Sequence, residues 1–125
     1  MISSLLLRVS VALLVVGLCL GIAMGVTQDF TLAPAHAHLN LVGFVVPFLA
    51  GLYYRAVPQG AQGALAAVQA WLAIVGAVVF PAGVAAVVGI GPQYEPLAIV
   101  GALIVLTAAA LFAVIVFRTS GARAA

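Results

Sequence analysis

The chain has 125 residues, of which 67% are hydrophobic and only 5% are charged. A soluble domain of this length could not cover so apolar a surface with so few charges, so the composition indicates a protein whose solvent is the lipid bilayer. Four arginines stand against two acidic residues, there is no lysine, and the formal net charge is +2. The sequence therefore contains no basic cluster that could bind nucleic acid.

Several apolar segments are long enough to cross a hydrocarbon core, which is about 30 Å thick and needs roughly 20 residues of helix. We therefore expect an all-α integral membrane protein that forms a single membrane domain over residues 1–125. The expected fold is a four-helix transmembrane bundle with short connections. Its helices are expected to cover about residues 5–26, 34–56, 65–88 and 96–117.

The first expected helix carries three glycines, Gly17, Gly21 and Gly25, at intervals of four residues. Residues four apart lie one above another on a helix, so these glycines share one face. In a membrane, such a face allows another helix to approach closely. We expect it to pack against the second helix, at Gly43 and Gly51.

The second expected helix follows the loop TQDFTLAPA. Pro34 suits its first turn, where no amide donor is needed, and Asp29 or Thr31 can cap its N-terminus. The third expected helix contains Pro81 and Gly83. Proline removes a backbone hydrogen bond, so these residues are expected to kink the helix or to weaken its outer third.

The distribution of charge predicts the orientation of the four helices. With four crossings, all four arginines fall on one side of the membrane: Arg8, Arg55, Arg118 and Arg123. Asp29 and Glu95 fall on the other side. The positive-inside rule makes the arginine side cytoplasmic, so both termini are expected inside. We expect a multi-pass protein of the bacterial inner (cytoplasmic) membrane.

Both histidines of the chain, His36 and His38, lie at the outer end of the second expected helix. Residues two apart on a helix point about 200° away from each other, so the two imidazoles cannot ligate one metal unless the first turn unwinds. His36 shares a small and polar face with Asn40 and is expected to face other helices. Ionisable residues inside a membrane are often functional. The alternative is that the histidines only bond to loop carbonyls or lipid headgroups.

His38 stands at the top of an aliphatic stripe on the same helix. The stripe consists of Leu41, Val42, Val45, Leu49 and Leu52. At a rise of 1.5 Å per residue, the helix between His38 and Arg55 is about 25 Å long, which places His38 just inside the outer boundary of the hydrocarbon. We expect the stripe to pack on a large apolar ligand or on a second copy of the chain, with the imidazole acting as a coordinating group.

The segment over residues 36–58 resembles a known helix. It contains HLNL at 38–41, YY at 53–54 and VP at 57–58. These residues resemble the second helix of the catalytic subunit of bacterial nitric oxide reductases, which belong to the haem–copper oxidase superfamily. The fuller pattern, with HAH at 36–38, GF at 43–44 and AG at 50–51, is similar to NnrS-type haem- and copper-containing membrane proteins. The resemblance implies that His38, or as second choice His36, is an axial haem ligand.

The chain also departs from that superfamily. An oxidase core has many more helices, and it needs further histidines for its second haem and its copper. Here no histidine exists outside His36 and His38. One chain cannot build a binuclear centre that reduces oxygen or nitric oxide, so catalysis by a single chain is not expected and its status as an enzyme stays open.

Three functions remain as hypotheses. The first is a small haem b protein in which His38 is the ligand and Asn40 bonds an imidazole or a loop carbonyl. Its haem would serve electron transfer or sensing near the outer face. Its sixth ligand would come from a second copy in a homo-oligomer, most simply a dimer, or from Met24. The second is a metal-handling protein that binds copper through His36 and His38. The third is a cofactor-free accessory subunit that packs against a respiratory complex.

Overall fold

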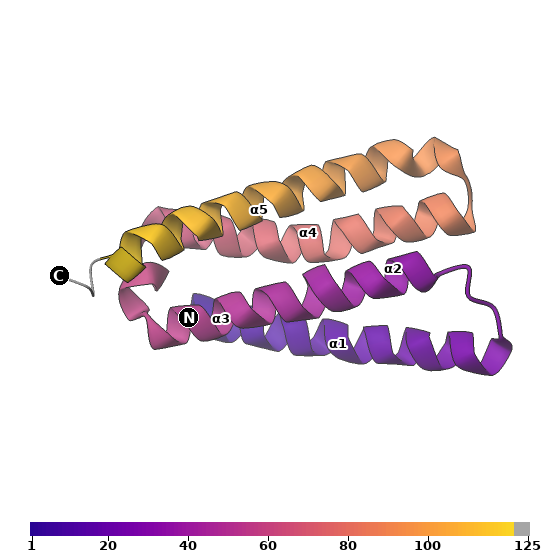
Figure 1. Ribbon diagram of the computed structural model, residues 1–125, viewed down its shortest axis with the longest axis horizontal. Coiled ribbons are helices and arrows are strands. Elements are labelled where there is room, and N and C mark those ends of the chain that lie inside the picture. Colours follow the sequence, from indigo (N-terminus) through magenta and orange to yellow (C-terminus); the bar gives the residue numbers. More distant parts are fainter. Residues whose placement is uncertain (122–125) are drawn as a thin grey trace.

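The computed structural model describes residues 1–121, and this part of the chain is helical with no strand (Figure 1). Arg123, which the orientation prediction uses, lies outside the described residues. Four segments are long and apolar enough to cross a membrane, as predicted: Ile2–Thr27, Ala33–Ala56, Gly63–Gly89 and Pro92–Gly121. Each extends one to four residues beyond its expected range at one end or both.

The first segment is one continuous helix, whereas the second is assembled from three pieces. Helix α1 (Ile2–Thr27) ends at Gln28, whose φ of 57° turns the chain into the loop. The second segment consists of α2 (Ala33–His38), the π-helix η1 (Leu39–Val45) and α3 (Val46–Ala56).

The start of α2 confirms one local prediction and contradicts another. Pro34 lies in the first turn, as expected. The N-cap residue is Leu32, however, and no side chain caps the helix. The Asp29 carboxylate instead accepts hydrogen bonds within the loop, from the Thr31 hydroxyl at 2.6 Å and the Thr31 amide at 3.0 Å. These two bonds hold the pKa of Asp29 below its usual value.

The second half of the chain forms a helical hairpin. A short 3-10 turn, η2 (Pro58–Ala61), leads into α4 (Gly63–Gly89). A second such turn, η3 (Pro92–Tyr94), leads into α5 (Glu95–Gly121). Helix α4 continues through Pro81 and Gly83, so the proline does not end it.

The four segments are arranged as two hairpins side by side (Figure 1). Helix α1 packs on the second segment, and α4 packs on both the second segment and α5. Helix α5 packs mainly on α4 and on the turns at its two ends, so it leaves much of its surface open. Helix α5 therefore lies at the edge of the four-helix arrangement.

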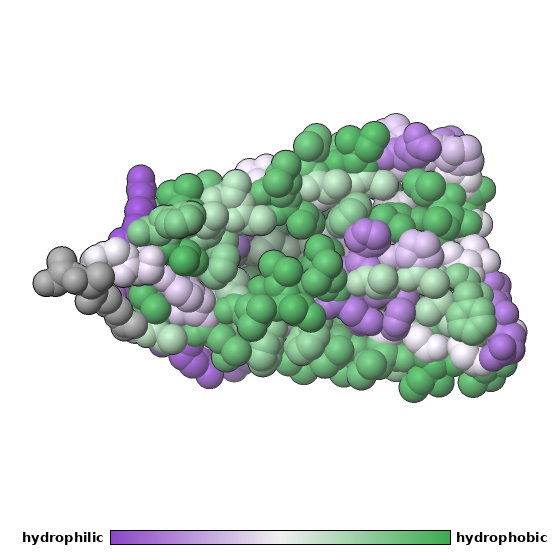
Figure 2. Space-filling model, in the orientation of Figure 1, coloured by the Kyte–Doolittle hydropathy of each residue, from purple (hydrophilic) through white to green (hydrophobic). Residues whose placement is uncertain are grey.

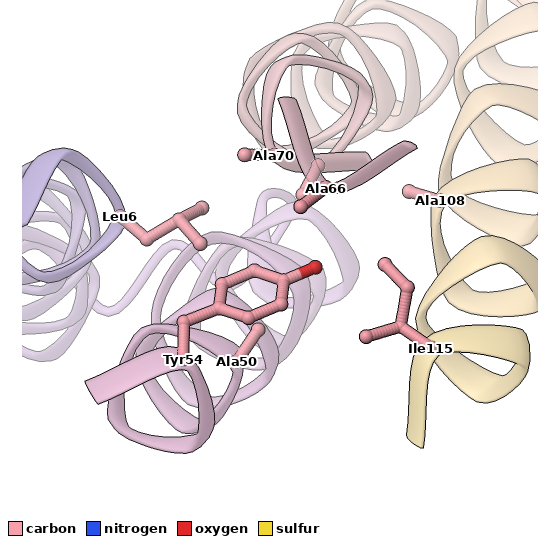
Figure 3. Close-up of a cluster of buried hydrophobic side chains, with 8 residues drawn as sticks. Leu6, Ala50, Tyr54, Ala66, Ala70, Ala108 and Ile115 are labelled. Carbon is pink, nitrogen blue, oxygen red and sulfur yellow. The ribbon is translucent and has the colours of Figure 1, made fainter. Parts of the chain in front are cut away.

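The buried core lies at the end of the molecule where the helices converge (Figures 1 and 3). It consists of small residues from α3, α4 and α5 packed around a few large side chains: Leu6, Ala50, Tyr54, Ala66, Ala70, Ala73, Ala108 and Ile115. Alanine at so many positions lets helices approach closely, which is how helices associate where lipid removes the hydrophobic driving force.

A chain of hydrogen bonds crosses this core. The buried Tyr54 hydroxyl of α3 donates to the Gln69 side-chain oxygen of α4 at 2.7 Å. The Gln69 amide nitrogen in turn lies 3.4 Å from the carbonyl oxygen of Ala108 in α5, to which it donates. The two hydrogen bonds therefore link α3, α4 and α5. A polar group in hydrocarbon must find its partner inside the protein, and these groups supply partners for one another.

Candidate functional site

The second segment changes its hydrogen-bonding pattern directly after His38. From Leu39 to Val45 the backbone is π-helical, and the amide of Val46 donates to the carbonyl of Leu41. Pro47 follows at once and has no amide hydrogen to continue an α-helical pattern. Segments of π-helix occur frequently at functional sites. The apolar periodicity predicts one regular α-helix here, and Pro47 is the residue that could have indicated an irregularity.

His38 has a defined tautomer. Its Nδ1 lies 2.6 Å from the carbonyl oxygen of Pro34, four residues earlier. A carbonyl oxygen only accepts, so Nδ1 carries the hydrogen, and in the neutral ring Nε2 holds the lone pair. Within the described residues Nε2 has no hydrogen-bond partner. The ring is half-buried and meets Phe80 of α4 edge to face, with the ring centroids 4.7 Å apart.

His36 lies on the opposite side of α2 and faces α1. A Cβ atom added at Gly21 would be 2.9 Å from Cε1 of this imidazole. Its Nε2 lies 3.2 Å from Nδ2 of Asn40, so the predicted contact between Asn40 and an imidazole is made with His36. Two atoms of this pair, Nδ1 of His36 and Oδ1 of Asn40, are buried without a partner.

The glycines of α1 make room for this polar pair. A Cβ at Gly17 would collide with the Asn40 side chain, as one at Gly21 would with His36. The prediction that this face packs on the second segment is therefore confirmed for two of its three glycines. It is wrong for Gly25, where a Cβ would meet no atom within 4 Å.

The predicted partners of that face were also wrong. Gly43 and Gly51 of the second segment lie against leucine side chains of α1, not against its glycines. A Cβ at Gly43 would be 3.4 Å from Leu13, and one at Gly51 would be 3.0 Å from Leu7. Each of the glycines that lies in this interface thus meets a larger side chain of the facing helix, which fills the space that the glycine leaves.

This arrangement predicts the effect of enlarging one glycine. Gly21→Leu is expected to destabilise the fold by about 1–3 kcal/mol, because the new side chain displaces the His36 ring from a packed interface. The loss can be measured by thermal or detergent-induced unfolding of the purified protein. Gly25→Leu is the matched control and should change stability little. Equal stability of the two variants would show that the His36 contact does not hold α1 in place.

The two imidazoles are separated, as the spacing of two residues predicted. His36 faces α1, and His38 faces α4. Among the described residues there is no group of three or more His, Cys, Asp or Glu side chains that could hold a metal ion. In this conformation the two histidines do not share a site.

Four residues of the predicted aliphatic stripe are exposed, and the fifth, Val42, is buried: Leu41, Val45, Leu49 and Leu52 face outward.

Hydrophilic side chains gather over α2, as they also do at the two ends of the molecule (Figure 2). Further along the same segment, a narrow apolar cavity of about 90 Å³ lies between η1, α3, α4 and α5, with Val42, Ala73 and Phe112 among its lining residues. Ligand pockets usually measure about 300–1,000 Å³, so this cavity is too small for a porphyrin.

Met24, the other predicted ligand, is only 7% exposed and lies three residues beyond Gly21 on α1.

Fold and site together define an all-helical protein with four segments that could span a membrane and two histidines in distinct environments. Comparisons with protein families, with curated proteins and with solved structures find no match for the chain. The similarity of residues 36–58 to haem–copper oxidase helices therefore remains a prediction from short motifs.

Proposed function

We propose that the protein binds haem b in the membrane and that His38 supplies an axial ligand. The observation that carries this proposal is the hydrogen bond from Nδ1 of His38 to the carbonyl of Pro34. Such a bond fixes the orientation of the ring and makes Nε2 a better ligand, and metal-ligating histidines nearly always have one. A haem b group, when bound, would supply one-electron redox chemistry, which suits electron transfer or sensing rather than catalysis by one chain.

The other histidine is less suited to ligation. Nε2 of His36 is within hydrogen-bond distance of Asn40, and its ring packs on Gly21 of α1. A ligand at this ring would have to separate two packed helices. The same geometry argues against copper held by both histidines, because the rings face different helices. His36 and Asn40 are therefore assigned to positioning α1 against the helix that carries His38.

A haem at His38 requires a second surface to cover it. The apolar cavity between η1, α3, α4 and α5 holds about 90 Å³, which is too small for a porphyrin. The outward-facing leucines and valines that follow His38 along the segment offer an apolar surface instead. We therefore infer a homodimer in which the second copy supplies the sixth ligand through its own His38. Met24 is the second choice, because it is buried.

The test is an absorption spectrum of the purified protein after expression with added haem. The proposal predicts a Soret band and one haem for two chains, measured by pyridine haemochrome assay and by mass in detergent. Stable dimers without haem, but with bound copper, would favour the metal-handling function. Protein without any cofactor, isolated together with a respiratory complex, would favour the accessory function. Either result would overturn the haem assignment.

The proposed orientation places both termini in the cytoplasm of a bacterial cell. It predicts that a cysteine introduced at Gln28 or Gln93, in a Cys19→Ser background, reacts with a membrane-impermeant maleimide from outside. A cysteine at Gln62 should react only after the membrane is opened. The reason is the clustering of arginines at one end of the helices, which favours the cytoplasmic side. Labelling at Gln62 in intact cells would contradict the orientation.

A further inference from the structure

A groove between α1 and α3 brings two arginines together. It lies at the end of the molecule that carries the N-terminus and has a volume of about 590 Å³. Its lining combines two cations, one hydroxyl and a wall of apolar side chains: Ser4, Leu7, Arg8, Val11, Ala12, Val15 and Arg55. Arg8 and Arg55 are exposed, and neither makes an ion pair within the described residues.

Both arginines line the groove beside the same stretch of α1. Nη2 of Arg55 lies 3.4 Å from Oγ of Ser4, so this side chain reaches from α3 to α1. Ser4 and Arg8 are four residues apart and therefore lie on one face of α1, one turn from each other. Asp29 lies in the loop after α1, and Glu95 is the first residue of α5. Both are at the opposite end of the helices from the two arginines and cannot neutralise this pair.

The remainder of the groove is apolar and follows α1 away from the arginines. From Arg8 to Val15 the helix rises about 10 Å, and Val11, Ala12 and Val15 line the groove along that length. A ligand that fits both parts needs an anionic group at one end and a hydrocarbon chain at the other. A free anion would use only the arginines and leave the apolar wall exposed.

We propose that this groove binds an anionic phospholipid of the surrounding leaflet. Its phosphate lies between Arg8 and Arg55, and one acyl chain follows Leu7, Val11 and Val15. Arginine suits this task because its planar group presents several donors to phosphate oxygens. Basic pockets between transmembrane helices recognise anionic headgroups in this way. The proposal does not depend on the haem assignment, because it uses other residues at the other end of the second segment.

The experiment measures lipid binding to the purified protein in detergent by native mass spectrometry. Dioleoyl phosphatidylglycerol is titrated against dioleoyl phosphatidylcholine, which has the same chains and no net charge. The wild-type protein should prefer the anionic lipid, and Arg8→Gln and Arg55→Gln should each reduce that preference about fivefold. The matched control is Arg118→Gln, because this exposed arginine at the end of α5 carries the same charge outside the groove.

A second variant tests the apolar part of the groove. Ala12→Trp fills the groove without changing the charge, and it should lower binding of the anionic lipid while leaving the unfolding temperature close to the wild-type value. Equal affinity for both lipids, or an equal loss in Arg118→Gln, would overturn the proposal. Complete displacement of the lipid by millimolar inorganic phosphate would also overturn it, because the site would then recognise a free anion.

Discussion

His38→Ala is expected to abolish the Soret band of the haem-loaded protein. His38 is the histidine whose Nε2 keeps a lone pair without a hydrogen-bond partner among the described residues, and its loss removes the ligand from both copies of the proposed dimer. Imidazole added to the medium should restore part of the band, because it can occupy the space that the side chain leaves. This recovery separates loss of a ligand from loss of the fold, and the absorption spectrum measures both.

The control for this experiment is the other histidine. His36→Ala should retain haem with a weaker or shifted band, because His36 holds α1 through Gly21 and Asn40. Asn40→Ala should shift the spectrum for the same reason and not erase it. A His38→Ala protein with the wild-type spectrum would refute the ligand assignment. Complete loss of haem in His36→Ala, with the wild-type unfolding temperature, would transfer the ligand role to His36.

Gly101→Leu is expected to have the largest effect on the fold. A Cβ at this position in α5 would lie 2.5 Å from Cα and 2.7 Å from the backbone nitrogen of Phe80 in α4. Backbone atoms inside a helix cannot shift as the end of a flexible side chain can, so the two helices must separate. We expect a loss of about 3 kcal/mol or more, at the upper end of the usual cost of overpacking.

The same substitution connects the helix interface to the candidate site. Phe80 contacts His38 through its ring, so a displaced α4 should also shift the haem spectrum. Stability is measured by unfolding in detergent, and the spectrum is recorded on the same sample. Gly121→Leu is the control in the same helix, because a Cβ there would meet no atom of residues 1–121 within 4 Å. If both variants unfolded alike, the close approach at Gly101 would not be a stabilising contact.

The site was predicted in part, and the separation of its two histidines was predicted correctly. His36 and His38 face different helices because two residues of helix turn the chain by about 200°, which depends only on the backbone between them. The choice of neighbours was not predictable from the same periodicity. Gly17 and Gly21 meet Asn40 and His36, whereas the glycine spacing predicts that glycine meets glycine.

Three further features of the structure were not predicted. The π-helix after His38 depends on which backbone donors the packed neighbours and Pro47 leave available. Apolar periodicity reports only which side chains are apolar, so it does not indicate this change in backbone hydrogen bonding. The contact of Gly101 with Phe80 joins residues from two helices, and nothing in the local sequence of α5 distinguishes Gly101 from a glycine without a partner. The carboxylate of Asp29 likewise bonds within its loop and does not cap α2.

The sequence by itself determined that the chain forms four apolar helices and that its histidines lie at one end of the second helix. Those properties follow from composition and from the geometry of a single helix in lipid. Only the tertiary structure decided which helix each imidazole packs against: α4 for His38 and α1 for His36. That outcome depends on Phe80 of α4 beside His38 and on Gly21 of α1 beside His36, because contacts between distant segments set the environment of each ring.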